Sequence, residues 1–222
     1  MALFIDTANL DEIREIVKWG VISGVTTNPK IVTRESGISL KERILEICDI
    51  VDGPISVELI NENIEDMIKE AEEYSSWHKN IVIKVPMGAA ELEVVNILEM
   101  GKNIRTNVTA IMAANQVLLA AFAGATYVSL FVGRIGDMGY DSFEIVAETK
   151  SMLVKQGLSS KIIVGSIRHL IDINRSVLAG ADIITVPYKF FKQMATNPKT
   201  IETINEFNSA WKNMREKGLI RM

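Results

Sequence analysis

Lys84 lies inside an apolar run that leaves an ammonium group no polar face. The run, Ile-Val-Ile-Lys-Val-Pro at residues 81–86, is short and β-branched, which is typical of a buried strand in a parallel sheet. Burying a lysine there is costly unless the amine is paired or loses its proton. A neutral amine in an enclosed site is the nucleophile that Schiff-base chemistry on a carbonyl substrate needs. The strand alone also allows a lysine that protects a sheet edge or one that reaches to solvent.

Polar residues recur near the ends of other short apolar runs. Because side chains alternate along a strand, Asn107 shares a face with Thr109, and Ser129 shares one with Phe131. Four of the remaining runs contribute one or two polar residues near their ends: Asp6, Thr26, Asn28, Glu58 and Ser166. Each has a structural explanation by itself, such as a helix cap or a turn. A packed interior would prefer aliphatic residues there, so the whole set predicts a functional site.

Two segments contain the residue types of an anion site. Ser166 and Arg168 lie where an apolar run passes into a helical pattern, and Arg134 directly follows another run. Many barrels bind phosphate after their seventh strand, with helix N–H groups and a guanidinium fork. We therefore expect a phosphate site, although either arginine also fits a surface ion pair.

These residues belong to an alternation of short apolar runs and longer amphipathic stretches. The expected strands are Leu3–Ala8, Gly24–Asn28, Ile55–Leu59, Ile81–Pro86, Ile104–Thr109, Tyr127–Val132, Lys161–Ser166 and Asp182–Pro187. The expected helices are Leu10–Trp19, Leu40–Val51, Ile64–Ser76, Ala89–Met100, Ile111–Gly124, Ser142–Gln156 and Ile167–Ala179. Strands that alternate with helices indicate parallel βαβ units.

Eight strands close a (β/α)8 TIM barrel, whose size range includes a chain of 222 residues. A doubly wound open sheet is the alternative, but no glycine-rich phosphate loop follows the first strand. We predict an α/β protein with one TIM-barrel domain over residues 1–222. An amphipathic helical tail covers about residues 198–217, and its apolar face needs a packing partner.

The composition excludes several classes of partner. A net charge of −4 gives no basic surface for nucleic acid, and no apolar run is long enough to span a membrane. The single cysteine, Cys48, fits a reducing compartment and a buried structural thiol. Neither His78 nor His169 has a partner at metal-ligand spacing, so we predict no metal site and a cytoplasmic protein.

Several segments together resemble the transaldolases, and within them the short group that also contains fructose-6-phosphate aldolases. The matching segments are Phe-Ile-Asp-Thr-Ala at 4–8, Gly-Val-Thr-Thr-Asn-Pro at 24–29, Ile-Lys-Val-Pro at 83–86, Asn-Val-Thr at 107–109, Val-Gly-Arg at 132–134 and Gly-Ser-Ile-Arg at 165–168. The resemblance runs over essentially the whole chain. It implies a Schiff-base enzyme acting on sugar phosphates, without a cofactor.

The resemblance also implies roles for individual residues. Lys84 is the expected nucleophile and Asp6 the acid/base, while Glu58 and Thr109 hold and activate water. Expected substrate-binding residues are Thr26, Asn28, Asn107, Ser129 and Phe131, and expected phosphate-binding residues are Arg134, Ser166 and Arg168.

Phe131 and Glu58 distinguish the activities of the resembled family. Aldolases of the group typically carry Tyr and Gln at these two positions, and a phenylalanine ring cannot donate a proton to an enamine. We therefore predict a transaldolase of the pentose phosphate pathway. An aldolase that releases free dihydroxyacetone and a non-catalytic sugar-phosphate-binding barrel are the alternatives. Short members of the group often form rings of five, so we expect a homo-oligomer, either a pentamer or a decamer.

Overall fold

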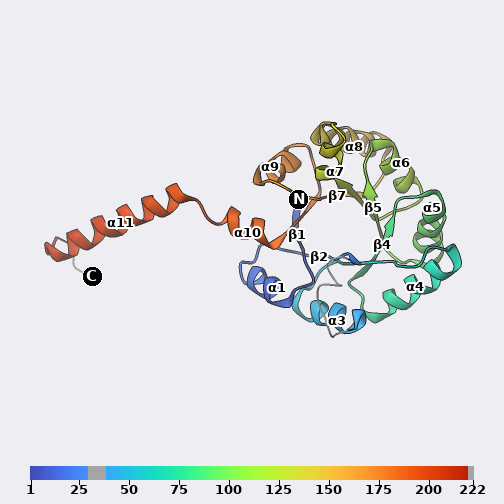
Figure 1. The fold of residues 1–222 in the computed structure, drawn as a ribbon, viewed down its shortest axis with the longest axis horizontal. Coiled ribbons are helices and arrows are strands. Elements are labelled where there is room, and N and C mark those ends of the chain that lie inside the picture. The colour runs from blue at the N-terminus through green and yellow to red at the C-terminus, as the bar shows by residue number, and fades with distance from the viewer. Residues whose placement is uncertain (30–38, 220–222) are drawn as a thin grey trace. The chain divides into compact units, whose positions relative to one another are not determined.

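The computed structural model describes residues 1–29 and 39–219. Eight parallel strands close into a barrel in chain order, with β8 paired to β1, and helices surround them (Figure 1). The strands are β1 (Ala2–Asp6), β2 (Val25–Thr26), β3 (Ile55–Glu58), β4 (Ile81–Pro86), β5 (Thr106–Ile111), β6 (Tyr127–Phe131), β7 (Lys161–Gly165) and β8 (Ile183–Val186). The predicted TIM barrel is confirmed.

The helices follow the strands along the chain. They are α1 (Leu10–Val17), α3 (Leu40–Ile50), α4 (Ile64–Trp77), α5 (Ala89–Asn96), the π-helical η1 (Ile97–Gly101), α6 (Ala114–Phe122), α7 (Val132–Asp137), α8 (Ser142–Gln156), α9 (Leu170–Leu178), α10 (Tyr188–Met194) and α11 (Pro198–Glu216). The chain divides into two compact units, residues 1–188 with the barrel and residues 189–222. None of the described helices is long and apolar enough to cross a membrane.

Three regions differ from the sequence-based expectation. Strand β5 begins and ends two residues later than predicted, and its pairing with β6 shifts register between Val108 and Ile111. The expected helix over residues 89–100 changes to π geometry at Ile97. The short helices α7 and α10 are not predicted, because six or seven residues give too little amphipathic periodicity.

The inward-facing residues of the strands form two levels. Near the N-terminal ends, five buried residues make an apolar cluster: Phe4, Val82, Tyr127, Ile163 and Ile183. Two positions further along the same strands, the same face carries Asp6, Lys84, Ser129, Gly165 and Thr185. Because residues two apart share a face, the chemistry-bearing level stands directly above an apolar floor.

Phe4 fills the floor of the barrel because Gly24 leaves it room. A Cβ atom on residue 24 would lie 2.6 Å from two carbons of the Phe4 ring, so no larger residue fits without moving the ring. At the same end of the barrel, Glu99 of η1 accepts hydrogen bonds from the backbone N–H groups of Thr106 and Thr126 at 2.6 and 2.8 Å. The π turn therefore ties the starts of β5 and β6 together.

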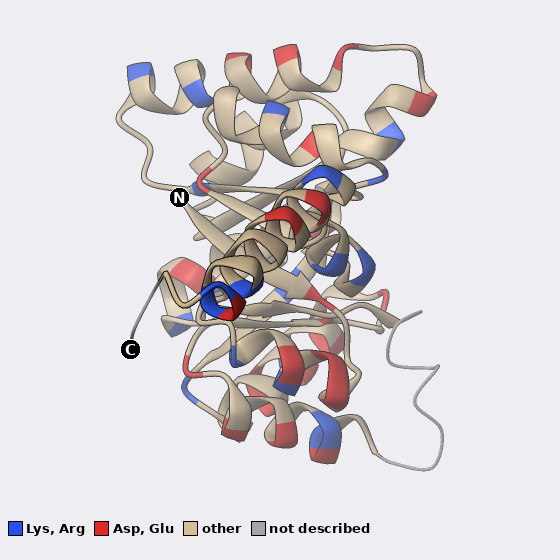
Figure 2. Ribbon diagram, turned by 90° about the vertical axis from the view of Figure 1, so that its left-hand side faces the viewer, with Lys and Arg blue, Asp and Glu red and all other residues tan. Residues whose placement is uncertain are grey.

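Charged side chains lie mainly on the outer helices. Lys and Arg are interspersed with Asp and Glu on the face that Figure 2 shows, in keeping with the net charge of −4.

Candidate active site

A cavity of about 440 Å³ opens at the C-terminal ends of the strands. This is the end at which barrel enzymes place their chemistry. The lining includes every predicted site residue except Arg168: Asp6, Thr26, Asn28, Glu58, Lys84, Asn107, Thr109, Ser129, Phe131, Arg134 and Ser166. The structure thus brings these side chains together in one cavity.

Lys84 is buried and paired. Its Nζ lies 2.9 Å from Glu58 Oε2 and donates a hydrogen bond to the Thr27 carbonyl at 3.1 Å. Glu58 lies directly opposite Lys84 in the register of β3 and β4. Only 7% of the Lys84 side chain is exposed, so it neither protects a sheet edge nor reaches into solvent. The amine is instead enclosed beside a carboxylate that is placed to exchange a proton with it.

Asp6 faces the same cavity from β1. Burial raises the pKa of its carboxyl group, a hydrogen bond from Thr26 and the charge of Lys84 oppose that rise, and Glu58 adds to it. Thr26 Oγ1 donates to Asp6 Oδ1 at 2.7 Å. Asp6 is thus a carboxyl group whose pKa lies above its ordinary value despite those opposing influences, a perturbation typical of residues at functional sites.

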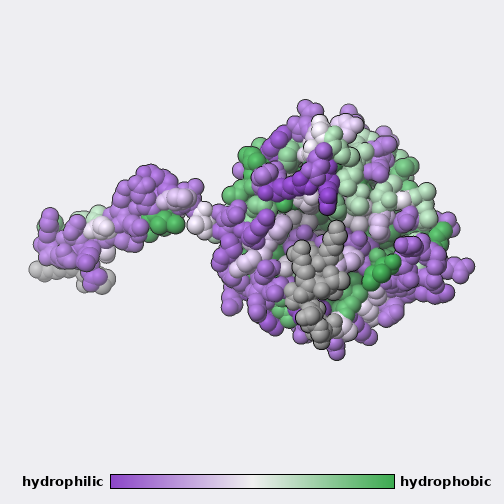
Figure 3. Space-filling model, in the orientation of Figure 1, coloured by the Kyte–Doolittle hydropathy of each residue, from purple (hydrophilic) through white to green (hydrophobic). Residues whose placement is uncertain are grey.

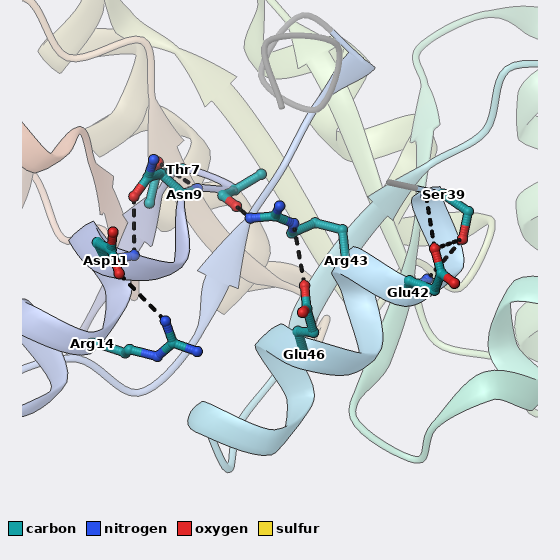
Figure 4. Close-up of polar contacts among 9 residues, drawn as sticks. Thr7, Asn9, Asp11, Arg14, Ser39, Glu42, Arg43 and Glu46 are labelled. Atoms are coloured by element: carbon teal, nitrogen blue, oxygen red, sulfur yellow. Dashed lines mark hydrogen bonds and ion pairs between the residues drawn. The ribbon is translucent and has the colours of Figure 1, made fainter. Parts of the chain in front are cut away.

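The loop after β1 is held by caps and by α3 (Figure 4). Asn9 caps α1 by accepting from the backbone N–H groups of Asp11 and Glu12 at 3.0 and 3.1 Å. From α3, Arg43 donates to the Ala8 carbonyl at 3.2 Å. These bonds fix the backbone just beyond Asp6, and so restrict where the Asp6 carboxyl group can move.

A second polar chain crosses from β3 to β6. Ser129 donates to Asn107 Oδ1 at 2.7 Å, and Asn107 Nδ2 donates to Ser56 Oγ at 3.2 Å. All three residues are buried. The Asn107 side chain is therefore oriented from both sides, with its position in the cavity wall fixed in advance.

Thr109 and Ala110 stand at the bulge of β5. The backbone of Ala110 has a φ of 57°, in the left-handed region that an alanine rarely adopts, and it also lines the cavity. Thr109 Oγ1 is buried and lacks a hydrogen-bond partner among the described residues. Bulges often redirect side chains beside active sites, and here a hydroxyl is left available to a bound molecule.

The start of α7, which directly follows β6, approaches the loop after β7 at Gly133. A Cβ atom on residue 133 would lie 2.3 Å from the Ser166 carbonyl oxygen and 2.8 Å from Ser166 Oγ, so only glycine fits. The Gly133 N–H donates to that carbonyl at 3.2 Å. This close contact brings Arg134 and Ser166 to one end of the cavity, where they form a cationic, hydrogen-bonding corner.

Arg168 is placed differently from the other predicted phosphate-binding residues. It does not line the cavity, and both of its terminal nitrogens donate to the two carboxylate oxygens of Asp137. These hydrogen bonds hold the pKa of Asp137 below its ordinary value. Arg168 thus lies outside the cavity lining, in an ion pair with Asp137 of α7.

Four cavity-lining residues are absent from the predicted set: Pro29, Ala110, Gly165 and Thr185. Thr185 meets the same criterion that identifies Thr26, a polar residue near the end of a strand, and could have been found from the sequence. Ala110 and Gly165 bear no polar side chain, so residue type gives no signal for them.

Other candidate groups lie outside this cavity. Cys48 is buried in α3, and burial with the nearby Asp49 raises its pKa to about 11, which keeps the thiol protonated. Within residues 1–29 and 39–219, no three His, Cys, Asp or Glu side chains gather in a way that could hold a metal ion.

Comparison with known proteins identifies the family. The family model described as "Transaldolase/Fructose-6-phosphate aldolase" matches residues 3–220. The chain belongs to the transaldolase/fructose-6-phosphate aldolase family. A "Probable transaldolase" of Clostridium tetani is 50% identical over 217 residues, covering 97% of this chain and all of that protein. Another from Thermoanaerobacter sp. is 49% identical over 219 residues, covering 99% of both chains.

A likeness to a more distant solved structure concerns the fold alone. Thiamine phosphate pyrophosphorylase from Pyrococcus furiosus superposes with a TM-score of 0.58 at 12% identity, over 84% of this chain and 85% of that one. The family therefore rests on the sequence matches, and the barrel on the structure.

Proposed function

We propose that this protein is a transaldolase. It transfers a dihydroxyacetone unit from fructose 6-phosphate or sedoheptulose 7-phosphate to an aldose phosphate, through a Schiff base on Lys84. The observation that carries the proposal is the Lys84 amine, enclosed 2.9 Å from Glu58 in a cavity that also contains Asp6. A binding site alone has no need of a buried amine beside one carboxylate in a cavity that contains a second.

Lys84 and Glu58 form the imine in this proposal. Transfer of a proton from the Lys84 ammonium group to Glu58 leaves a neutral amine, which adds to the ketone carbon of the sugar. The carbonyl oxygen then takes up protons and leaves as water, and the product is a protonated imine. Thr109, with its unpartnered buried hydroxyl, holds that water together with Glu58.

Asp6 breaks the carbon–carbon bond. Its carboxylate removes the proton of the C4 hydroxyl, the C3–C4 bond breaks, and its electron pair moves into the protonated imine to give an enamine. The aldose phosphate leaves with C4 as its aldehyde carbon. In the second half the enamine attacks the acceptor aldehyde, Asp6 returns its proton to the new hydroxyl, and water hydrolyses the imine.

The remaining residues position the sugar. Asn28, Asn107 and Ser129 hydrogen-bond the dihydroxyacetone portion, with Asn107 oriented in advance by its partners. Arg134 and Ser166 bind the terminal phosphate at the cavity corner. Arg168 is already hydrogen-bonded to Asp137, so it contributes to phosphate binding less directly than Arg134 and Ser166 do. Binding at the phosphate in this way is converted into alignment at the reacting carbons.

Phe131 favours transfer over release. Its ring lines the cavity and offers no proton to the enamine carbon. An enamine without a nearby proton donor persists until an aldehyde arrives. A transaldolase therefore fits this wall better than an aldolase that discharges free dihydroxyacetone.

The test is the release of glyceraldehyde 3-phosphate from fructose 6-phosphate, with and without erythrose 4-phosphate, in a coupled assay. We expect sustained release only with the acceptor, after at most one turnover per site without it. Sustained release without the acceptor would make the protein an aldolase. No release under either condition, with sugar phosphate still bound, would indicate a binding protein.

We further propose a homo-oligomeric, cytoplasmic protein. Apolar side chains are exposed on the side of the barrel that carries α5 and α6 (Figure 3), among them Leu119 and Phe122 at 54% and 61%. On α11, Ile201, Ile204 and Phe207 recur at helical spacing and are exposed. Light scattering should give the mass of several chains, and a monomeric mass would refute the oligomer.

A further inference from the structure

Asp6 has a threonine on each neighbouring strand. Strand β1 lies between β2 and β8, and the register places Thr26 opposite Asp6 and Thr185 opposite Phe4. Thr26 Oγ1 donates to Asp6 Oδ1 at 2.7 Å and lies 2.5 Å from Thr185 Oγ1. Asp6, Thr26 and Thr185 thus form a continuous hydrogen-bonded chain across three strands, and all three line the cavity.

The chemistry of a hydroxyl group fixes the direction of this chain. Each threonine has one hydrogen to donate, and an ionised carboxylate only accepts. When Asp6 is ionised, Thr26 donates to it, so Thr185 must donate to Thr26. When Asp6 has taken up a proton, the chain can reverse, with Asp6 donating to Thr26 and Thr26 to Thr185.

Packing fixes the orientation of Thr185. Its side chain is β-branched and therefore stiff about χ1, and the residue is 6% exposed. Its methyl carbon lies 3.3 Å from where a Cβ atom on Gly165 would stand, so the glycine leaves space for that methyl group. With the methyl group seated against β7, the hydroxyl is directed towards Thr26.

We propose that Thr185 is a positioning residue for Asp6, which holds the carboxylate ionised and oriented through the Thr26 hydroxyl. The proposal rests on the proposed function, in which Asp6 removes the C4 hydroxyl proton. Thr185 has no other hydrogen-bond partner among the described residues, so its hydroxyl serves this chain alone in the free enzyme.

Other groups around Asp6 act on its pKa in opposite directions, so the hydrogen bonds from the threonines matter to its ionisation. Lys84 of β4 favours the ionised carboxylate, whereas Glu58 of β3 and burial oppose it. The hydrogen bond from Thr26 is the largest influence that lowers the pKa of Asp6. A donor behind Thr26 polarises that hydroxyl and strengthens its bond to the carboxylate.

The experiment compares three substitutions of Thr185. Thr185→Val and Thr185→Ala both remove the hydroxyl, the first filling its space and the second leaving it empty. Thr185→Ser keeps the hydroxyl. Ser56→Ala is the matched control for the Asp6 titration only, because Ser56 is also a buried barrel hydroxyl but is hydrogen-bonded to Asn107 rather than to Asp6 or its threonines. Circular dichroism checks that each variant folds.

Two readouts follow the Asp6 carboxyl group. The first is a ¹³C NMR titration of aspartate-labelled protein, with Asp6→Asn to assign the signal. The second is the pH dependence of kcat/KM for fructose 6-phosphate with erythrose 4-phosphate. We expect Asp6 to titrate at higher pH in Thr185→Val and Thr185→Ala than in the wild type, Thr185→Ser and Ser56→Ala. One lost hydrogen bond predicts a fall in kcat/KM of about threefold on the acid limb.

An Asp6 titration that is unchanged in both Thr185→Val and Thr185→Ala would overturn the proposal, as would an equal change in Thr185→Ser. The NMR readout needs no turnover, so it decides the role of Thr185 even for an enzyme without transaldolase activity. If turnover depends on the acceptor but the Asp6 titration is unchanged in Thr185→Val and Thr185→Ala, Thr185 has no positioning role, whereas the proposed transaldolase function is supported.

Discussion

The floor and the upper level of the barrel use the same strands in opposite ways. On the floor, Phe4, Val82 and Ile163 are almost completely buried and belong to one apolar cluster. Two residues later, the same strands present Asp6, Lys84 and Gly165 to the cavity. A single step of two residues thus separates the part of the interior that stabilises the fold from the part that can react.

The two levels have opposite energetics. Burying the floor is favourable, by about 1.5–3 kcal/mol for each large apolar side chain. On the upper level, burial instead raises the pKa of Asp6 and encloses the Lys84–Glu58 pair, whose desolvation offsets much of its attraction. The upper level is therefore expected to reduce stability in return for reactivity, and substitutions should separate the two properties.

Asp6→Asn should lower activity by the largest factor and should raise stability. Loss of a general acid/base lowers kcat by about 10²–10⁴-fold. Burial raises the pKa of Asp6 in the folded state, so the folded protein holds this proton more tightly than the unfolded chain does. The resulting contribution to the free energy of unfolding is complete below pH 3.8, the ordinary pKa of the group, and is lost as the pH rises through the folded-state pKa. The variant should therefore become more stable than the wild type towards neutral pH, as urea unfolding would show.

Asp11→Asn is the control for Asp6→Asn, because the Asp11 side chain is 93% exposed. It should leave kcat unchanged. If Asp6→Asn is less stable than the wild type at every pH, the upper level does not oppose folding and the contrast between the levels fails.

Phe4→Ala tests the floor. Truncating a buried phenylalanine costs about 3–5 kcal/mol, and here it also leaves a gap above Gly24. Chemical unfolding should show this loss. The folded fraction should still form a Schiff base between Lys84 and fructose 6-phosphate, which borohydride reduction traps as a stable adduct. Val154→Ala, at a position that is 68% exposed, should change stability by no more than about 0.5 kcal/mol. Loss of the adduct in folded Phe4→Ala would mean that the two levels are not separable.

Arg134→Ala should weaken the use of phosphorylated sugars more than Arg168→Ala. Loss of a charged hydrogen-bond donor costs about 1.5–3 kcal/mol, so kcat/KM should fall by about 10- to 150-fold for Arg134→Ala. Arg168 is already engaged by Asp137, and its removal should cost less. Steady-state kinetics with fructose 6-phosphate and with unphosphorylated fructose would measure both. The reverse order would show that Arg168 leaves Asp137 to bind phosphate.

Phe131→Tyr should have the smallest effect. A phenol at this cavity wall introduces a proton donor, so glyceraldehyde 3-phosphate release without an acceptor should rise a few-fold while transfer persists. The coupled assay without erythrose 4-phosphate measures the change. An unchanged rate would indicate that another group keeps the enamine unprotonated.

Much of this arrangement could be predicted from the sequence, because a barrel strand has a strict period of two. That period places Asn107 with Thr109 and Ser129 with Phe131, and the structure has all four in the cavity lining. The strand count and the closed barrel follow from the alternation of apolar and amphipathic stretches. The functional roles of these residues remain predictions.

Other features depend on tertiary contacts that no local pattern reveals. The bulge at Ala110 and the π turn that brings Glu99 to Thr106 and Thr126 are set by neighbouring strands. The ion pair between Arg168 and Asp137 could not be located from the sequence, because α7, which carries Asp137, is too short to predict; the role of Arg168 in phosphate binding remains a prediction.

The most direct test of the account is reductive trapping of the substrate on Lys84. The protein is incubated with fructose 6-phosphate and borohydride, digested, and analysed by mass spectrometry, with Lys84→Met as the control. We predict a reduced dihydroxyacetone adduct on Lys84 in the wild type and none in the variant. An adduct on another lysine, or turnover without any adduct, would contradict the assignment of Lys84 as the nucleophile.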